Sequence, residues 1–179
     1  MPNQKDGFVV WLTGLPGSGK TTIATLAQEQ LKDMGHSVEF LDGDEVRKWL
    51  SPGEGFSRED RERHLRRVAH VAQLLSRNGV VVLCSFVSPY ISTREYARNI
   101  IPKFVEVYVK CSVETCIRRD PKGLYRQAAN GQIKNMTGVQ DVYEPPLAPD
   151  LVVDTESATP SESAGIVVSH LRGMGYLGN

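Results

Sequence analysis

Short runs of apolar residues alternate along the chain with stretches in which apolar residues recur every three to four positions. The runs predict strands at residues 8–13, 38–41, 80–86, 104–110 and 151–153. The stretches between them have the spacing of helices. Runs that are apolar throughout are typical of strands buried on both faces of a parallel sheet. The pattern therefore predicts an α/β fold, with a mainly parallel, five-stranded sheet and helices on both faces.

Residues that are preferred at helix N-caps and helix C-termini predict where the helices begin and end. We expect helices over 20–34, from Ser57 to about Arg77, and from Thr159 to about Gly173. Shorter helical stretches are expected near residues 46–50 and over 113–119. Ser92 with Glu95 matches a capping box, which predicts a further helix starting at that point.

The segment 122–149 is the least regular part of the chain. It contains three glycines, several basic residues and the pair Pro145-Pro146. Long irregular segments in compact enzymes are often lids over an active site. We expect residues 122–149 to form such a lid, within a single domain that spans residues 1–179.

The composition of the chain limits the kinds of molecule and the cell compartment that we expect for this protein. Lysine and arginine together number 21, as do aspartate and glutamate, so no net charge recruits nucleic acid or an acidic membrane. The apolar runs are too short to span a bilayer, and the polar residues 1–6 do not read as a signal peptide. Cys84, Cys111 and Cys116 form no C-x-x-C pair and are expected to be buried free thiols. These features predict a cytoplasmic protein.

Residues 14–21, with the sequence GLPGSGKT, match the phosphate-binding loop G-x-x-x-x-G-K-[ST] between a strand and a helix. Backbone N–H groups of such a loop surround phosphate oxygens at the positive end of a helix dipole. Lys20 can reach the β- and γ-phosphates, and the Thr21 hydroxyl can bind Mg²⁺. The predicted ATP-binding residues are Gly14, Leu15, Pro16, Gly17, Ser18, Gly19, Lys20, Thr21 and Thr22.

Two acidic residues, Asp42 and Asp44, follow the second predicted strand. Ligands of open α/β sheets bind at the carboxyl ends of the strands, which places both carboxylates beside the phosphate loop. Asp44 can accept a proton from an attacking hydroxyl, and Asp42 can hold a Mg²⁺-bound water. An acidic turn that caps the next helix is the alternative interpretation.

The long helix carries an inward stripe of apolar residues, and Arg61 continues this stripe toward the N-terminus, with His64 beside it. Arg63, Arg66 and Arg67 lie elsewhere on the helix and are expected to be solvated. An inward arginine needs an anionic partner. That partner is either a protein carboxylate or an anionic substrate, since a guanidinium matches phosphate and sulfate oxygens.

Three further residues are candidates for substrate contact. Arg47 follows Asp44 by three positions and can join Arg61. Phe56 can stack on a base or fill the core, and Ser88 can touch substrate or cap a helix at Pro89. The residue pattern leaves these alternatives open.

Together these stretches resemble the adenylylsulfate (APS) kinase family over nearly the whole chain. The phosphate loop is shared by many kinases, whereas the combination of the other motifs is specific. The motifs are Gly14–Thr21, Asp42-Gly43-Asp44 with Arg47, Gly55-Phe56-Ser57 with Asp60-Arg61, Ser88-Pro89-Tyr90, Lys122-Gly123-Leu124-Tyr125, Thr137-Gly138 and Tyr143-Glu144-Pro145-Pro146.

The resemblance implies a three-layer P-loop kinase fold and transfer of phosphate from MgATP to the 3′-hydroxyl of APS, the adenylylsulfate kinase reaction of sulfate activation (EC 2.7.1.25). It also implies a homodimer. By similarity, Arg47, Phe56, Arg61 and Lys122 contact APS, and Asp44 lies nearest the acceptor hydroxyl.

Ser88 matches a serine described in the family as a phosphoryl-accepting intermediate. A nucleophilic serine needs a neighbouring base, and the local sequence offers none. Direct in-line transfer needs only positioning and charge stabilisation. We therefore expect Ser88 to contact substrate without forming a covalent intermediate.

The chain departs from the family pattern at two positions. His64 occupies the place of an asparagine that is expected to contact APS, and its charge is expected to vary near pH ~6.5. A protonated His64 beside Arg61 would favour an anionic substrate at low pH. Met136 replaces a phenylalanine that forms a wall for the substrate adenine, a role that methionine can also fill.

Three other interpretations are compatible with parts of the sequence. The nearest is a P-loop kinase for another anionic nucleotide or a small hydroxyl compound. A nucleotide switch protein is suggested by Asp120-Pro121-Lys122-Gly123, which matches D-x-x-G, but the chain contains no N-K-x-D guanine motif. A domain of a sulfurylase–kinase fusion is the third, and the start at Met1 favours a stand-alone kinase.

Overall fold

The computed structural model describes residues 7–178. Residues 1–6, which the sequence predicts not to be a signal peptide, lie outside the described residues. Within residues 7–178, no helix combines the length and the apolar character needed to cross a bilayer.

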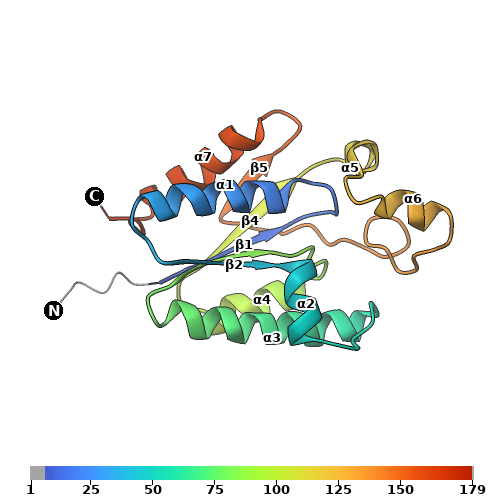
Figure 1. Ribbon diagram of the computed structural model, residues 1–179, viewed down its shortest axis with the longest axis horizontal. Helices are drawn as coiled ribbons and strands as arrows, with labels where there is room; N and C mark the ends of the chain where they lie inside the picture. The colour runs from blue at the N-terminus through green and yellow to red at the C-terminus, as the bar shows by residue number, and fades with distance from the viewer. Residues whose placement is uncertain (1–6, 179) are drawn as a thin grey trace.

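Five parallel strands form one sheet, as predicted (Figure 1). The strand order, which was not predicted from the sequence, is β2-β3-β1-β4-β5. The strands are β1 (Val9–Thr13), β2 (Val38–Asp42), β3 (Val81–Ser85), β4 (Phe104–Lys110) and β5 (Leu151–Asp154). Every residue of β1 and β3 is buried, whereas the edge strands β2 and β5 are partly exposed. The apolar runs thus mark central strands, which are covered on both faces.

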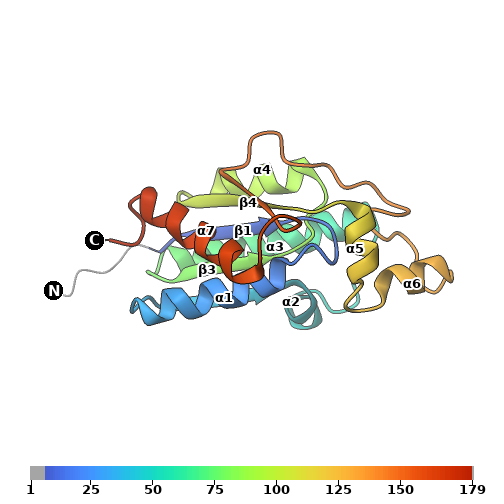
Figure 2. The ribbon, with the colours of Figure 1, turned by 90° about the horizontal axis from the view of Figure 1, so that it is seen from above.

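Helices cover both faces of the sheet, which confirms the three-layer α/β fold (Figures 1 and 2). On one face, α1 (Lys20–Asp33) and α7 (Pro160–Gly173) pack together; on the other, α3 (Arg58–Ser76) packs on α4 (Ile91–Ile100). Each face has its own buried apolar cluster. The short helices α2 (Gly43–Leu50), α5 (Val113–Arg119) and α6 (Leu124–Ala129) complete the fold.

The predicted helix caps are correct at two helices and wrong at a third. Ser57 accepts a hydrogen bond from the Asp60 amide, and Thr159 forms the predicted capping box. The expected box at Ser92 is wrong, because the N-cap of α4 is Tyr90, two residues before Ser92, and its side chain forms no capping hydrogen bond. The Glu144 carboxylate, from a distant part of the chain, accepts a hydrogen bond from the Ile91 N–H instead.

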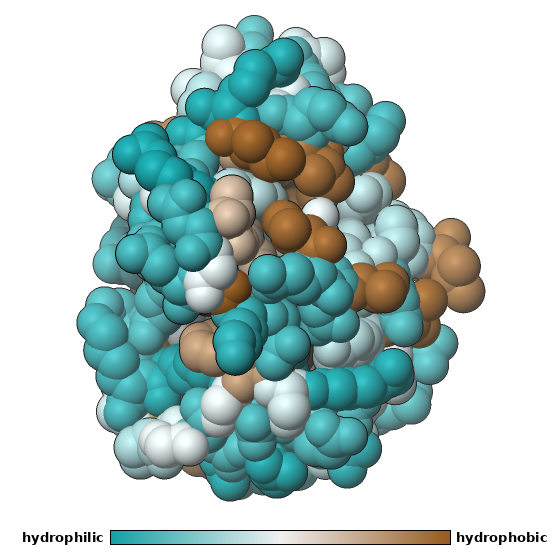
Figure 3. Space-filling model, turned by 90° about the vertical axis from the view of Figure 1, so that its right-hand side faces the viewer, coloured by the Kyte–Doolittle hydropathy of each residue, from teal (hydrophilic) through white to brown (hydrophobic). Residues whose placement is uncertain are grey.

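The expected lid segment, 122–149, lies at the end of the molecule where the strands have their carboxyl ends (Figure 1). It is mostly irregular, as predicted, but it contains helix α6. Tyr125, Ala128 and Met136 of this segment pack with Leu15 of the phosphate loop in a third apolar cluster. Figure 3 shows this end of the molecule as a largely hydrophilic surface with separate apolar groups.

The cysteines Cys84, Cys111 and Cys116 are free and buried, as expected. Burial raises the pKa of the Cys116 thiol to about 12, so this thiol stays protonated.

Candidate active site

The phosphate loop joins β1 to α1, in the strand–loop–helix context that the motif requires. Gly17 and Gly19 have φ angles of 79° and 102°, a left-handed conformation that favours glycine. A side chain at Gly17 would also approach the Cys116 carbonyl oxygen to 3.2 Å. The backbone of the loop therefore depends on glycine at these positions.

Lys20 lies folded back onto its own loop. Its Nζ donates hydrogen bonds to the carbonyl oxygens of Gly14 at 2.9 Å and Leu15 at 2.7 Å. The side chain is buried, and desolvation lowers its pKa from 10.5 to about 8. The carbonyl groups hold the ammonium at the centre of the loop, where a phosphate can compete for it.

Thr21, Asp42 and Ser85 bring three oxygen ligands together beside the phosphate loop. The Thr21 hydroxyl donates to Asp42 Oδ2 at 3.0 Å and lies 3.3 Å from Ser85 Oγ. The pairing of Asp42 with Ser85 in the β2–β3 register places both at the same sheet edge. Oxygen donors of this kind suit Mg²⁺.

The capping interpretation of the Asp-Gly-Asp stretch is correct for Asp42. This residue is the N-cap of α2, and its Oδ1 accepts the Asp44 N–H at 3.1 Å. Asp44 lies in the first turn with its carboxylate exposed, where it pairs with Lys122 of the lid segment. The pair raises the pKa of Lys122. The carboxylate of Asp44 is therefore open to a ligand, and its role as a base stays a prediction.

Phe56 is exposed rather than part of the core, with 56% of its surface accessible. The guanidinium carbon of Arg47 lies 4.5 Å from the ring centroid, and that of Arg61 lies 5.6 Å from it. Arg47 also donates to the Gly55 carbonyl. An aromatic ring with two guanidinium groups offers both stacking area and positive charge.

The inward Arg61 finds its partners within the protein. Its Nε donates to the Phe56 carbonyl at 2.9 Å, and its Nη2 donates to the Asn135 carbonyl at 2.7 Å. The Asp141 carboxylate lies 3.9 Å from Nε. Arg61 therefore ties α3 to the lid segment. Sequence reasoning missed Asp141, because only the fold brings residues 61 and 141 together.

His64 does not have the ionisation that the sequence suggested. The residue is buried, and its Nδ1 lies 2.8 Å from Ser51 Oγ. Burial, with the charges of Arg47 and Arg67, lowers its pKa from 6.5 to about 4. A titration of His64 near neutral pH is therefore not supported, and a contact with APS stays a prediction. Arg63, Arg66 and Arg67 are exposed, as expected.

Ser88 lies in a buried network and not at a reactive surface. Its Oγ accepts from Trp11 Nε1 at 3.1 Å and donates to Thr13 Oγ1 at 2.9 Å. None of these partners is a base that could take the hydroxyl proton. This geometry agrees with the expectation that Ser88 forms no covalent intermediate.

Met136 is 5% exposed and packs in the cluster beneath the lid segment. The neighbouring Gly138 lies against Leu15, because a Cβ there would come within 2.8 Å of the Leu15 side chain. The lid segment thus rests directly on the phosphate loop. Contact between Met136 and a substrate adenine stays a prediction.

The sheet order, the phosphate loop at the carboxyl end of β1 and the acidic pair at the end of β2 define a P-loop phosphotransferase fold. Solved structures under 25% identical share this fold, among them a shikimate kinase of Acinetobacter baumannii (17% identity, TM-score 0.62, covering 95% of this chain and 96% of that one). That likeness concerns the fold alone.

Comparison by sequence gives the family. Residues 6–154 match the model of the adenylylsulphate kinase family. A probable adenylyl-sulfate kinase of Aeropyrum pernix is 54% identical over 172 residues (94% of each chain), and an adenylyl-sulfate kinase of Halothermothrix orenii is 50% identical (99% of this chain, 95% of the relative). The chain belongs to the adenylylsulphate kinase family.

A solved structure of this family contains a nucleotide analogue and APS. The APS kinase CysC of Mycobacterium tuberculosis, in complex with AMPPNP and APS, superposes with a TM-score of 0.90 at 40% identity. The match covers 93% of this chain and 98% of that one.

Proposed function

We propose that this chain transfers the γ-phosphoryl group of ATP to the 3′-hydroxyl of adenosine 5′-phosphosulfate, giving 3′-phosphoadenylyl sulfate and ADP. Membership of the adenylylsulphate kinase family carries this proposal. The geometry supports it, because Thr21 of the phosphate loop bonds to Asp42, the N-cap of the helix that carries the exposed Asp44 carboxylate. Arg47 of the same helix and Arg61 flank the exposed ring of Phe56.

Each group of residues has a distinct part in the proposed reaction. Residues 14–22 bind the ATP phosphates. The Lys20 ammonium leaves the carbonyl groups of Gly14 and Leu15 and binds the phosphate oxygens, on which negative charge develops during transfer. Asp44 accepts the proton of the acceptor hydroxyl. The phosphoryl group then passes directly from ATP to the acceptor oxygen, with no protein-bound intermediate.

The acceptor nucleotide is held by cations and by an aromatic face. Arg47, Arg61 and Lys122 supply positive charge for the phosphosulfate, and Phe56 offers its exposed ring to the adenine. His64 and Met136 complete the proposed substrate site, together with Ser88. Residues 122–149 act as the lid, whose contacts with Asp44 and Arg61 must rearrange when substrates enter.

We propose Mg²⁺ as the cofactor, bound with ATP. The Thr21 hydroxyl, with the Asp42 carboxylate acting through a water, would hold it, and their oxygen atoms fit a hard cation. When bound, Mg²⁺ neutralises charge on the phosphates. The side chains of Thr21 and Asp42 orient each other through their hydrogen bond.

The proposed setting is a cytoplasmic homodimer that uses ATP and APS and binds neither nucleic acid nor membrane. The buried free thiols fit a reducing compartment. Exposed apolar side chains, Val142 at 64% and Leu147 at 85%, offer surface for a second copy. Light scattering of the purified protein tests the dimer, and a monomeric mass would contradict it.

An acceptor panel tests the proposed reaction. ADP formation is measured with APS, nucleoside monophosphates, gluconate and shikimate at equal concentration. We expect APS to be preferred by a factor of roughly a hundred or more, since binding groups matched to one substrate reject others strongly. A higher rate with any other acceptor would replace the proposal with a kinase of that substrate class.

A further inference from the structure

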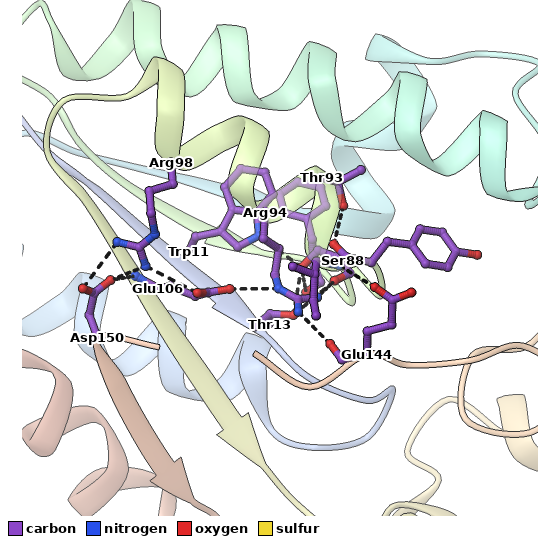
Figure 4. Close-up of polar contacts among 12 residues, drawn as sticks. Trp11, Thr13, Ser88, Thr93, Arg94, Arg98, Glu106, Glu144 and Asp150 are labelled. Carbon is purple, nitrogen blue, oxygen red and sulfur yellow. Dashed lines mark hydrogen bonds and ion pairs between the residues drawn. The ribbon is translucent and has the colours of Figure 1, made fainter. Parts of the chain in front are cut away.

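Arg94 of helix α4 is a buried cation that belongs to none of the predicted site residues. It is 2% exposed, and its guanidinium donates in three directions (Figure 4). Nε donates to Glu106 Oε1 at 2.8 Å, Nη1 to the Ser88 carbonyl, and Nη2 to the Glu144 carbonyl at 2.6 Å. One planar group therefore joins β4, the loop after β3 and the part of the lid segment around Glu144, which we call the returning end of the lid.

The loop after β3 has a strained conformation at the point that Arg94 holds. Ser88 has a φ angle of 39°, which is uncommon for a residue other than glycine. The Ser88 carbonyl accepts from Arg94, and its hydroxyl bonds with Trp11 and Thr13. Thr13 is the residue before the phosphate loop, so the bend is fixed relative to the ATP side of the site.

The returning end of the lid is attached at the same place. Glu144 Oε2 accepts the N–H of Ile91, the first residue of α4, at 2.8 Å, and this bond replaces the missing N-cap side chain of the helix. The Glu144 N–H donates to the Pro89 carbonyl at 2.8 Å, a bond between two backbone groups. Arg94 binds the carbonyl of the same Glu144, so the start of α4 and the end of the lid form one unit.

This unit extends to the acceptor side of the site through Tyr90. The Tyr90 hydroxyl donates to Asp141 Oδ2 at 2.7 Å, and the Asp141 carboxylate lies 3.9 Å from Arg61 Nε. Arg61 lies against the exposed ring of Phe56. The position of this cationic group therefore depends on the loop that Arg94 holds.

Arg98 provides a matched comparison on the same helix. It contacts Glu106 at 3.4 Å and pairs with Asp150 at 2.7 Å, on the side away from Ser88 in Figure 4. Its side chain is 38% exposed, against 2% for Arg94. Arg98 thus shares the ion-pair network but not the two carbonyl contacts.

We propose that Arg94 is a positioning residue for the phosphoryl acceptor. Its guanidinium fixes the loop 88–90 and the returning end of the lid at one point, and through Tyr90 and Asp141 it sets the place of Arg61. This inference rests on the proposed function, since the acceptor that Arg61 and Phe56 would hold is APS.

The variants Arg94→Lys and Arg98→Lys test this role, because each keeps the charge and removes the planar fork. The KM values for APS and for ATP are measured separately, with the other substrate saturating. We expect Arg94→Lys to raise the KM for APS about tenfold or more and that for ATP by less than about twofold. Arg98→Lys should change neither KM by more than about twofold. Equal changes in both KM values, or the same behaviour of the two variants, would overturn the proposal.

The variant Glu144→Ala tests the proposal independently if Arg94→Lys does not fold. Glu144→Ala keeps the backbone carbonyl that Arg94 binds but removes the carboxylate that caps α4. It should show the same selective rise in the KM for APS. An unchanged KM for APS in this variant would contradict the proposal.

Amide exchange separates this inference from the proposed function. In the protein without substrates, exchange of the Ile91 and Glu144 amides should speed up in Arg94→Lys and not in Arg98→Lys. A parent protein inactive toward APS would refute the proposed function, and the exchange result would still decide whether Arg94 holds the two segments. Unchanged exchange at both amides would overturn the role of Arg94.

Discussion

Lys122, from the lid segment, forms an ion pair with Asp44, the carboxylate that we propose as the base. Both side chains are more than half exposed, so the pair itself adds little stability. Its importance is positional, because it places a cation of residues 122–149 beside the carboxylate that we propose as the base. We therefore expect Lys122 to leave the Asp44 carboxylate and bind the anionic substrate when the substrate enters.

Replacing Lys122 should weaken APS binding. Hydrogen bonds to charged groups contribute about 1.5–3 kcal/mol, so Lys122→Ala should raise the KM for APS roughly tenfold to a hundredfold. Initial rates over a range of APS concentrations measure the effect. Lys134→Ala, which removes another exposed lysine of the same segment, is the control and should leave the KM unchanged. Similar KM values in the parent and Lys122→Ala would place Lys122 outside the substrate site.

The lowered pKa of Lys20 predicts a pH dependence of ATP binding. In the free protein this pKa is about 8, and bound phosphates favour the charged form. ATP binding above this pH therefore requires proton uptake, and affinity should fall as the pH rises from about 7 to about 9. Titration calorimetry in buffers of different ionisation enthalpy measures the linked proton. Lys20→Arg keeps its charge throughout this range and should show a flatter profile. Identical profiles would mean that Lys20 does not titrate there.

Protonation of His64 should not change APS affinity between about pH 6 and pH 8, because the pKa of this residue is about 4. It should instead affect stability at lower pH. The unfolded chain protonates this residue near 6.5, whereas the folded protein keeps it neutral. Stability is therefore lost as the pH falls from about 6.5 toward 4.

The comparison with His64→Asn isolates this effect. The melting temperature of the parent should fall more steeply than that of His64→Asn over the same acidic range, and the two should bind APS with parallel pH profiles above it. If APS affinity rises more in the parent than in the variant as the pH falls to ~6, His64 is protonated when APS binds, and this prediction is wrong.

Ser88 should prove structural rather than nucleophilic. Removing its hydroxyl leaves the buried Trp11 N–H without its acceptor, which costs about 1–3 kcal/mol of stability. Ser88→Ala should melt at a lower temperature and still transfer phosphate at a rate within about tenfold of the parent. Rapid quench with radiolabelled ATP provides the direct test. A phosphoserine at position 88 that forms and decays at the turnover rate would contradict direct transfer.

The parts of the fold that depend on local sequence were predicted well. The strands are short apolar runs, and the phosphate loop carries its glycines, Lys20 and Thr21 within eight residues, so a single sequence is enough to find them. The caps at Ser57 and Thr159 are local for the same reason. The cap of α4 was missed because its acceptor, Glu144, lies 53 residues further along the chain.

The properties of the site residues depend on contacts that a helical wheel does not contain. The wheel places His64 inward, but only the fold shows Ser51 against its ring and the arginines that lower its pKa. The sequence pattern assigns no role to Arg94. Its burial follows from carbonyl groups at residues 88 and 144, which meet only after the sheet has formed.

The measurement that tests the central claim most directly is the identity of the product formed from APS and ATP. The purified protein is incubated with both nucleotides, and the product is analysed by phosphorus NMR and mass spectrometry. Asp44→Asn, which removes the proposed base and keeps the shape of the side chain, is run in parallel. We expect a new phosphate on the 3′-oxygen of APS, one ADP for each, and a rate in Asp44→Asn reduced roughly a hundredfold or more. Absence of APS-dependent ADP, phosphate at another position, or a normal rate in Asp44→Asn would contradict the account.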